Sequence, residues 1–281
     1  MKKMMIAGVA VAVMAVQGCG SKGSVAVESY DFVTDSIGVV DTLQVEGSVA
    51  SVCISGFYPV GEGVLADSVR MWLADHLANT SSYSGEPLFV VSGADAADGD
   101  ALIKKCCDSL MDGARCDFVD FAENGFTSSY DYDVRFGPVS ESDSLLTYYL
   151  TAYGYQGGAH GGISAVNATF NRNTGVILTY DNVFKPECRA QLIEMIKEGL
   201  WSQYFEENIS EATLADVLLI NPDELQLPAT LPLFEDNGVV FTYQQYEIAP
   251  YAAGMPSCVL TYKQLEPLMC PEVITLLPKS Y

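Results

Sequence analysis

The sequence predicts an α+β fold in which mostly antiparallel sheets pack with a few helices in two lobes. Segments of strand-like and helical character come in blocks rather than in strict alternation, which favours this class over a parallel α/β fold. Hydrophobic residues make up 49% of the 281 residues, which is enough for a large buried core and argues against disorder.

The first lobe, residues 29–137, is predicted to have strands at both ends and two helices between them. Residues 25–60 have strand-like composition with partial alternation of apolar and polar side chains. Apolar residues recur at helical spacing over residues 63–78, which predicts a helix with one face against a sheet. A second helix is predicted over residues 101–122, and residues 128–139 return to strand.

The second lobe, residues 138–281, is predicted to follow a soft boundary at Gly137 and Pro138. It begins with a tyrosine-rich strand, which a glycine-rich stretch interrupts, and it continues with two hairpins and a helix that has Pro186 near its first turn. The expected segments are, in order, a strand at 144–156, the glycine-rich stretch at 157–162, a hairpin at 163–180, a helix at 188–208, a short helix at 212–220, a hairpin at 231–248 and a final short strand.

The N-terminus predicts export and lipid attachment. Two lysines precede an uncharged apolar run that is too short to span a bilayer, as in secretory signals. A glycine then precedes Cys19, the pattern that lipoprotein signal peptidase reads. We expect a signal peptide over residues 1–18, lipid on Cys19 and a tether over residues 19–28; the alternative is an ordinary signal with a chance cysteine. No acidic cluster follows Cys19, so we expect the periplasmic side of a bacterial membrane rather than the cell surface.

The chain is strongly acidic, with 36 Asp and Glu against 14 Lys and Arg and a formal charge of −22. Loss of Lys2 and Lys3 with the signal would make the charge −24. This charge disfavours nucleic acid and anionic lipid headgroups as partners, because like charges repel. It suits a basic partner or cations, and it also serves plain solubility.

Seven cysteines remain if Cys19 carries lipid, and an odd number cannot all pair within one chain. Their spacing is not that of a metal site, so we expect small buried residues with one or two disulfides of undetermined connectivity. The seven are Cys53, Cys106, Cys107, Cys116, Cys188, Cys258 and Cys270.

No sequence motif indicates an enzyme. A nucleophile elbow, a zinc-protease helix and a phosphate-binding loop are all missing, and the chain has only two histidines. We therefore expect no cofactor, no metal and no catalytic residue. His76, on the first predicted helix, is expected to be solvated or hydrogen-bonded. Paired carboxylates such as Glu206 with Glu207 are expected by chance in so acidic a chain, although a glycan-active enzyme could use such a pair.

The stretch "YGYQGGAHGG", residues 153–162, places four glycines around the second histidine, His160. Glycine permits positive φ and close approach of the backbone, so a bulge or tight connection between strands is the favoured interpretation. His160 would then tie the connection to the core, and contact with a ligand is the alternative.

Three stretches together resemble a known family. They are "YYLTAYGYQGGAHGG", "FNRNTGVILTYDNVFKPE" and "VVFTYQQYEIAPYAAG" with "VLTYKQL" after it. The same order and similar distances occur in the extracytoplasmic domain of the lysozyme-sensing anti-sigma factor RsiV, in the non-catalytic region of the peptidoglycan deacetylase PdaC, and in many bacterial lipoproteins. The resemblance covers residues 144–262 well, and residues 45–135 resemble the companion domain that precedes it.

The resemblance implies a two-part α+β fold and an extracytoplasmic location, and in RsiV it implies lysozyme as a protein ligand. The chain lacks the deacetylase motifs and a sigma-binding segment, so neither of those activities is expected. We therefore expect a lipid-anchored, non-enzymatic binding module of the cell envelope, for a basic protein such as lysozyme or for peptidoglycan. The alternatives are a glycan-active enzyme with unrecognised acidic residues and a structural envelope lipoprotein.

Two predictions concern the site. We expect the glycine–histidine stretch to meet the "YEIAPYAAG" stretch, with Glu247 accepting a hydrogen bond from His160, Tyr155 or Tyr251, because a buried carboxylate needs a donor. We expect ligand contact at Tyr153, Tyr155 and Gln156, since tyrosine supplies contact area at low entropic cost. The structural signature comprises Gly157, Gly158, His160, Gly161, Tyr246, Glu247, Pro250, Tyr251 and Gly254.

Overall fold

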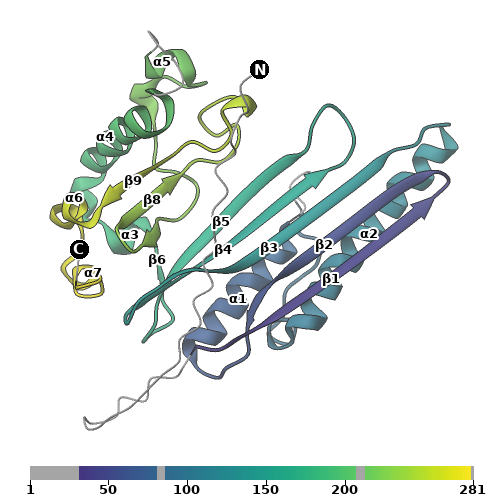
Figure 1. Ribbon diagram of the computed structural model, residues 1–281, viewed down its shortest axis with the longest axis horizontal. Helices are drawn as coiled ribbons and strands as arrows, with labels where there is room; N and C mark the ends of the chain where they lie inside the picture. The colour runs from purple at the N-terminus through teal and green to yellow at the C-terminus, as the bar shows by residue number, and fades with distance from the viewer. Residues whose placement is uncertain (1–31, 81–85, 207–212, 280–281) are drawn as a thin grey trace, which may run out of the picture. The chain divides into compact units, whose positions relative to one another are not determined.

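The computed structural model describes residues 32–80, 86–206 and 213–279. The predicted signal peptide, the tether and Cys19 lie outside these residues. A six-stranded sheet and a three-stranded sheet form the framework, each with its own helices (Figure 1). The predicted α+β class with mostly antiparallel sheets is therefore confirmed.

The six-stranded sheet has its strands in chain order from β1 to β6. Every pairing is antiparallel except that of β2 with β3, because two helices intervene there and carry the chain back to the starting end of the sheet. The strands are β1 (Thr34–Val45), β2 (Ser48–Pro59), β3 (Ser129–Glu141), β4 (Leu145–Tyr155), β5 (Gly162–Asn171) and β6 (Ile177–Leu178).

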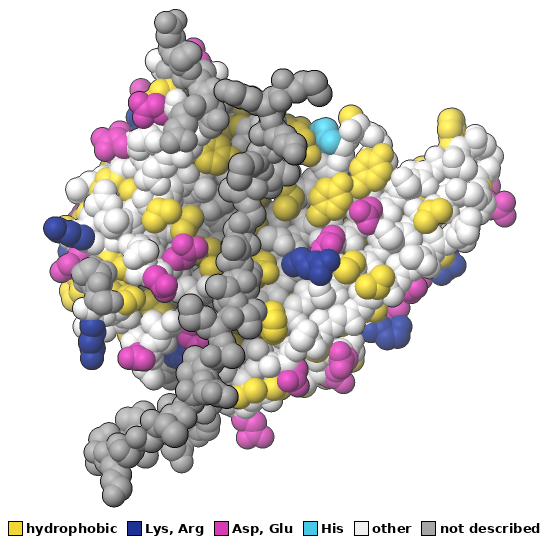
Figure 2. Space-filling view, viewed as in Figure 1, with side chains coloured by type: hydrophobic (Ala, Val, Ile, Leu, Met, Phe, Trp, Pro, Cys, Tyr) yellow, Lys and Arg dark blue, Asp and Glu magenta, His cyan; other side chains and the backbone are white. Residues whose placement is uncertain are grey.

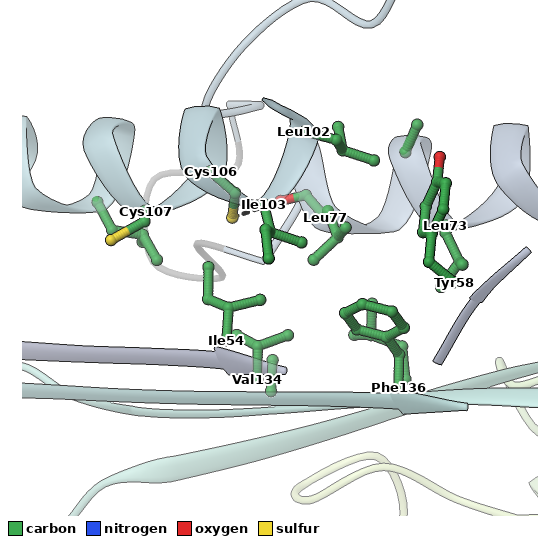
Figure 3. Close-up of a cluster of buried hydrophobic side chains, with 14 of the residues drawn as sticks. Ile54, Tyr58, Leu73, Leu77, Leu102, Ile103, Cys106, Cys107, Val134 and Phe136 are labelled. Atoms are coloured by element: carbon green, nitrogen blue, oxygen red, sulfur yellow. Dashed lines mark hydrogen bonds between the residues drawn. The ribbon is translucent and has the colours of Figure 1, made fainter. Parts of the chain in front are cut away.

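Helices α1 (Val64–Ala78) and α2 (Gly99–Glu123) cover one face of this sheet (Figure 1). Alternate strand residues are buried against them, as period-2 patterning requires. In Figure 3, side chains such as Ile54 and Phe136 rise from the strands towards Leu77 and Ile103 on the helices. These contacts form the first hydrophobic core.

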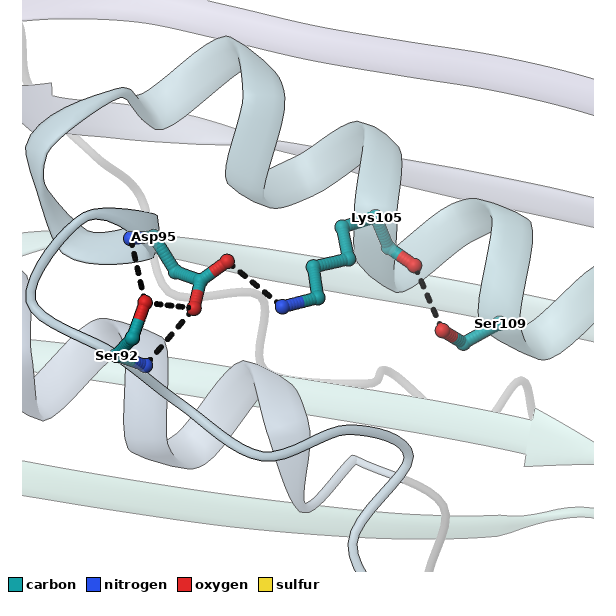
Figure 4. Close-up of polar contacts among 4 residues, drawn as sticks. All are labelled: Ser92, Asp95, Lys105 and Ser109. Atoms are coloured by element: carbon teal, nitrogen blue, oxygen red, sulfur yellow. Dashed lines mark hydrogen bonds and ion pairs between the residues drawn. The ribbon is translucent and has the colours of Figure 1, made fainter.

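The approach to α2 is held by a small polar network (Figure 4). Asp95 accepts hydrogen bonds from the backbone N–H of Ser92 at 2.8 Å and from Lys105 Nζ at 2.7 Å. These donors favour the charged carboxylate and lower the pKa of Asp95 to about 2, with Lys105 as the largest cause. Asp98 caps α2 by accepting the N–H of Ala101.

The three-stranded sheet is antiparallel and comprises β7 (Leu233–Glu235), β8 (Gly238–Thr242) and β9 (Ser257–Thr261). Helix α4 (Arg189–Leu200) and the π-helical turn η3 (Trp201–Phe205) pack along β9. Together they enclose a second hydrophobic core. Four short helices complete this part: α3 (Tyr180–Val183), α5 (Leu214–Val217), α6 (Tyr262–Leu265) and α7 (Pro271–Ile274).

The two sheets meet through β7. The hydroxyl of Thr147 on β4 donates to the carbonyl of Phe234 at 2.7 Å, and Thr169 on β5 accepts the N–H of Phe234 at 3.2 Å. The boundary predicted at Gly137 and Pro138 falls inside β3, and the first core continues as far as Phe170. A register shift beside Pro138 lets the strand continue past the proline.

Two further sequence expectations can be compared with the described residues. All seven cysteines there are unpaired, so the expected one or two disulfides are not formed. Cys106 and Cys258 are buried, and burial raises the pKa of each thiol to about 12. None of the helices in the described ranges is long and apolar enough to span a bilayer.

Candidate functional site

The glycine-rich stretch forms the connection between β4 and β5. Gly157 has φ +85° and Gly158 has φ +90°, a region that side chains disfavour. A Cβ atom on Gly161 would lie 2.5 Å from the hydroxyl of Tyr153, so the backbone there passes directly against that ring. The glycines therefore serve the geometry of the connection.

His160 contacts the second predicted stretch. Its ring stacks on Tyr251, with centroids 3.9 Å apart and an interplanar angle of 20°. Its Nδ1 lies 2.9 Å from the carbonyl oxygen of Gly161, which makes Nδ1 the donor. The glycine–histidine stretch and the "YEIAPYAAG" stretch therefore meet through stacked rings.

The predicted donors to Glu247 are wrong. Its Oε1 accepts the backbone N–H of Ala229 at 2.8 Å and its Oε2 accepts the N–H of Gln244 at 2.7 Å. These two backbone N–H groups satisfy the carboxylate of Glu247, so a hydrogen bond from His160 or a tyrosine is not required. Glu247 instead ties the segment before β7 to the turn after β8.

Tyr246 occupies a strained position in that turn. Its φ is +65°, which is unfavourable for a bulky residue, and the residue is 56% exposed. Its ring lies 5.9 Å from that of Tyr251. A strained backbone that presents an exposed aromatic ring beside another ring is typical of a binding surface rather than of a core.

The two glutamines before Tyr246 contact the outer edge of β5. Gln245 Oε1 accepts the N–H of Ile163 at 3.0 Å. Gln244 Oε1 accepts the N–H of Ala165 at 3.2 Å, and its Nε2 donates to the carbonyl of Ala165. Side-chain amides therefore occupy the place where a seventh strand would pair.

These elements surround a cleft of about 540 Å³, which we call the His160 cleft. The residues described in its lining carry no formal charge when His160 is neutral. They include aromatic rings, side-chain amides and small side chains. The lining comprises Thr80, Tyr132, Ala152, Gly154, His160, Gly161, Gly162, Ile163, Ser164, Val166, Ala229, Thr230, Gln244, Gln245, Tyr246 and Tyr251.

A second cleft of about 740 Å³, the Trp72 cleft, adjoins the first and shares Val166, Ala229 and Thr230 with it. His76 packs on Trp72 there with centroids 4.6 Å apart. Among its described lining residues, Asp75 alone carries a formal charge. Both histidines of the chain thus line one groove along β5, each against an aromatic ring; we call the two clefts together the β5 groove.

The residues predicted to contact ligand brace the connection beside this groove. Tyr153 is 37% exposed and lies under Gly161, and the hydroxyl of Tyr155 donates to the carbonyl of Gly158 at 3.2 Å. Gln156 Nε2 donates to the hydroxyl of Tyr132, a lining residue. None of the three predicted residues lines either cleft, so the groove places the candidate contacts on neighbouring residues.

Two signature residues shape the exit from the turn. Pro250 precedes the single 3₁₀ turn that carries Tyr251, and Gly254 ends this turn with φ +74°. The sequence did not indicate Gln244, Gln245 or Trp72 as site residues. Two adjacent glutamines at the end of a strand were the available signal for the first pair.

The described lining of the groove offers aromatic rings, side-chain amides and small side chains. Within the described residues, no three His, Cys, Asp or Glu side chains lie close enough to hold a metal ion. Burial, with a smaller contribution from Asp236, raises the pKa of Glu235, but Glu235 lies on β7 and lines neither cleft. These rings and amides border a strand edge that the side chains of Gln244 and Gln245 cap.

The fold is that of an α+β protein built of two sheets, with a groove along β5 of the larger sheet. Residues 181–263 match the family described as "Protein of unknown function (DUF3298)". A DUF3298 family member from Bacteroides fragilis shares the fold with a TM-score of 0.73 and 20% identity, over 90% of this chain and 99% of that one. A DUF3298 family protein from Pseudomonas aeruginosa aligns with a TM-score of 0.61 and 15% identity, over 89% and 98% of the two chains. No curated protein matches the sequence.

Proposed function

We propose that the protein is a non-enzymatic, lipid-anchored binding module of the bacterial cell envelope, and that it binds a basic protein partner in the β5 groove. The observation that carries the proposal is the groove itself. It offers exposed or stacked aromatic rings, side-chain amides and a strand edge, and its one formal charge is the carboxylate of Asp75. Aromatic anchors with few charges are typical of the centre of a protein interface.

The charge of the rest of the chain supports a basic partner. The formal charge is −22, and acidic side chains are spread over the face shown in Figure 2 with hydrophobic side chains between them. Such a field attracts a basic protein over distances up to about the Debye length, roughly 8 Å at physiological salt. Lysozymes are commonly basic, and the resemblance to a lysozyme-sensing domain makes them the first partners to test.

Peptidoglycan is the second candidate, and the rings of Tyr246 and Tyr251 favour it. Exposed aromatic rings with amides nearby also suit a ligand that has an apolar face and many hydroxyl groups. The His160 cleft has no charged residue in its described lining, so the neutral glycan chain would be the part that is recognised.

The test measures binding of hen lysozyme and of cytochrome c, a similarly basic but unrelated protein, to the purified full chain. We expect lysozyme to bind at about 0.15 M salt and more weakly at about 1 M, where the Debye length is about 3 Å. Tyr246→Ala should weaken binding about tenfold or more, as truncation of an aromatic anchor does. Phe126→Ala is the matched control, because Phe126 is 67% exposed but lies outside the groove, and it should change nothing.

Three outcomes would contradict the proposal. Equal binding of cytochrome c would show that the acidity acts through charge alone. Sedimentation with insoluble peptidoglycan that is lost in Tyr246→Ala would favour the glycan candidate instead. Release of reducing sugar or acetate from peptidoglycan by the pure protein would establish the enzymatic alternative.

The anchoring part of the proposal has its own test. Cys19→Ser should abolish labelling of the protein with radioactive palmitate and leave an uncleaved or unanchored species. Normal labelling of this variant would exclude lipid attachment at Cys19. Protease treatment of intact cells should spare the wild-type protein if it faces the periplasm.

A further inference from the structure

The side-chain amide of Gln244 bonds to β5 as a strand would. In an antiparallel ladder, every second pair of facing residues exchanges both hydrogen bonds, one N–H to C=O in each direction. Gln244 does the same with Ala165, because its Oε1 accepts the N–H at 3.2 Å and its Nε2 donates to the carbonyl. Ile163, two residues earlier, points its N–H to the same edge, where Gln245 Oε1 accepts it at 3.0 Å.

The edge that these amides occupy opens onto the β5 groove. Gly162, Ile163, Ser164 and Val166 line the His160 cleft, and Val166 and Asn167 line the Trp72 cleft. β6 pairs only with Thr169 and Phe170, so it leaves the earlier part of β5 without a neighbouring strand. A groove therefore follows the free half of a strand whose edge is capped by two side chains.

We propose that an extended segment of the partner protein adds to β5 as an antiparallel strand and replaces the amides of Gln244 and Gln245. This inference rests on the proposed function and specifies how the partner is held. The exchange conserves hydrogen bonds. The partner's backbone would bond to the N–H groups of Ile163 and Ala165 and to the carbonyl of Ala165, and the side chains of the two glutamines would bond to water instead. Pairing by backbone bonds also explains why the groove needs few charged groups.

The groove specifies the side chains of that segment. In a strand alternate side chains share one face, so every second residue of the added strand would point into the groove. There Met71, Trp72 and Val166 offer apolar contact, and Asp75 offers a carboxylate whose side chain is 68% exposed. No Lys or Arg is found among the described lining residues of either cleft. The segment that fits presents apolar residues to the groove, and basic residues at the alternate positions suit the acidic charge of the chain.

The probe is a peptide of about six residues, the usual length of a strand, with alternating valine and lysine and blocked ends. Its first control has glutamate in place of lysine. Its second control carries N-methyl groups on the backbone nitrogens of one edge, which removes the donors of that edge and leaves the side chains unchanged. Binding to the full chain is measured by calorimetry, and the amides of Ile163 and Ala165 are followed by NMR.

We expect the valine–lysine peptide to bind and to shift the amide signals of Ile163 and Ala165. N-methylation of the bonded edge should weaken binding about tenfold or more, and glutamate should also weaken it. Gln244→Ala should strengthen binding several-fold, because the peptide no longer displaces an amide. Gln203→Ala is the matched control, since Gln203 makes the same two bonds to Val259 on β9, away from the groove. It should leave the affinity unchanged.

The result separates this inference from the proposed function. If lysozyme binding depends on Tyr246 but the peptide binds equally well with N-methyl groups or not at all, strand addition is wrong and the binding function stands. If the peptide binds as expected but no basic protein does, the strand site stands and the proposed partner class is wrong. An equal effect of Gln203→Ala and Gln244→Ala on peptide affinity would also overturn the inference. Wild-type protein with the N-methylated peptide decides the matter even if Gln244→Ala fails to fold.

Discussion

The outer edges of β5 and β9 carry the same device in different surroundings. On β9, Gln203 Nε2 donates to the carbonyl of Val259 at 3.0 Å and Gln203 Oε1 accepts its N–H at 2.9 Å. On β5, Gln244 makes the corresponding pair of bonds to Ala165. In each sheet, therefore, one glutamine bonds both the N–H and the C=O of a residue on a strand edge that has no neighbouring strand among the described residues at that point.

The difference lies in what covers each edge. Helix α4 packs along β9 so closely that a Cβ atom on Gly199 would lie 3.0 Å from Cβ and Sγ of Cys258. β5 instead borders two clefts. The comparison teaches that a glutamine cap alone does not define a groove. Val259 on the edge of β9 is 39% exposed but no residue of β9 is among the described lining of either cleft, whereas the edge of β5 opens onto both.

The largest expected effect is a difference in the rate at which two thiols are alkylated, one on β9 and one on β5. Burial raises the pKa of Cys258 to about 12, and an added Ser164→Cys would place a thiol in the His160 cleft instead. An ordinary thiol has a pKa of about 8.5, so near neutral pH the thiolate fraction of Cys258 is lower by a factor on the order of 10³. Peptide mapping after alkylation with iodoacetamide should show Cys258 reacting slower than residue 164 by about that factor. Similar rates in the folded protein would mean that the β9 edge opens; in denaturant the two rates should converge.

A smaller effect concerns the turn that carries the β5 cap. Glu247→Ala leaves the N–H groups of Ala229 and Gln244 without their acceptor, so it should lower the free energy of unfolding by about 1–3 kcal/mol in urea titrations. His160→Ala removes the stacking on Tyr251 and should cost about 0.5–1.5 kcal/mol. The two residues have separate partners, so the double variant should show the sum within about 0.5 kcal/mol. A clear departure from additivity would mean that they interact after all.

The two glutamine caps should differ slightly in their contribution to stability. Gln203→Ala should cost less than about 1 kcal/mol, because its two hydrogen bonds to Val259 are exposed and water can replace the amide. Gln244→Ala should cost about 1–2 kcal/mol, because its hydrogen bonds to Ala165 are half-buried. Hydrogen exchange should follow the same order, with the amide of Ala165 better protected than that of Val259. Equal costs would remove the distinction between a half-buried edge and an exposed one.

The sequence predicted the meeting of the two signature stretches but not their contacts. The glycines around His160 and the proline and glycine around Tyr251 indicate connections at strand ends. Such signals depend only on neighbouring residues in the sequence. Gln244 bonds to Ala165 across 79 positions of the chain, and that pairing depends on how the sheets pack. Periodicity shows that a face is buried without showing what lies against it. The boundary predicted at Pro138 falls within β3, where a shift in strand register accommodates the proline, a strong local breaker.

The smallest expected effect tests whether the open edge has been shaped for binding rather than for stability. Tyr246 holds φ +65° while the residue is 56% exposed, so its burial does little to offset the strain. Glycine adopts this φ freely, and Tyr246→Gly should raise the free energy of unfolding by up to about 1 kcal/mol, less the entropy that glycine adds to the unfolded chain. The same variant should weaken lysozyme binding, because it removes the aromatic anchor. At β9 the described residues offer no such position, as their positive-φ residues other than glycine are Glu46 and Tyr246. A variant that is both less stable and equally active would show that Tyr246 is part of the packing, and the comparison between the two edges would then lose its functional meaning.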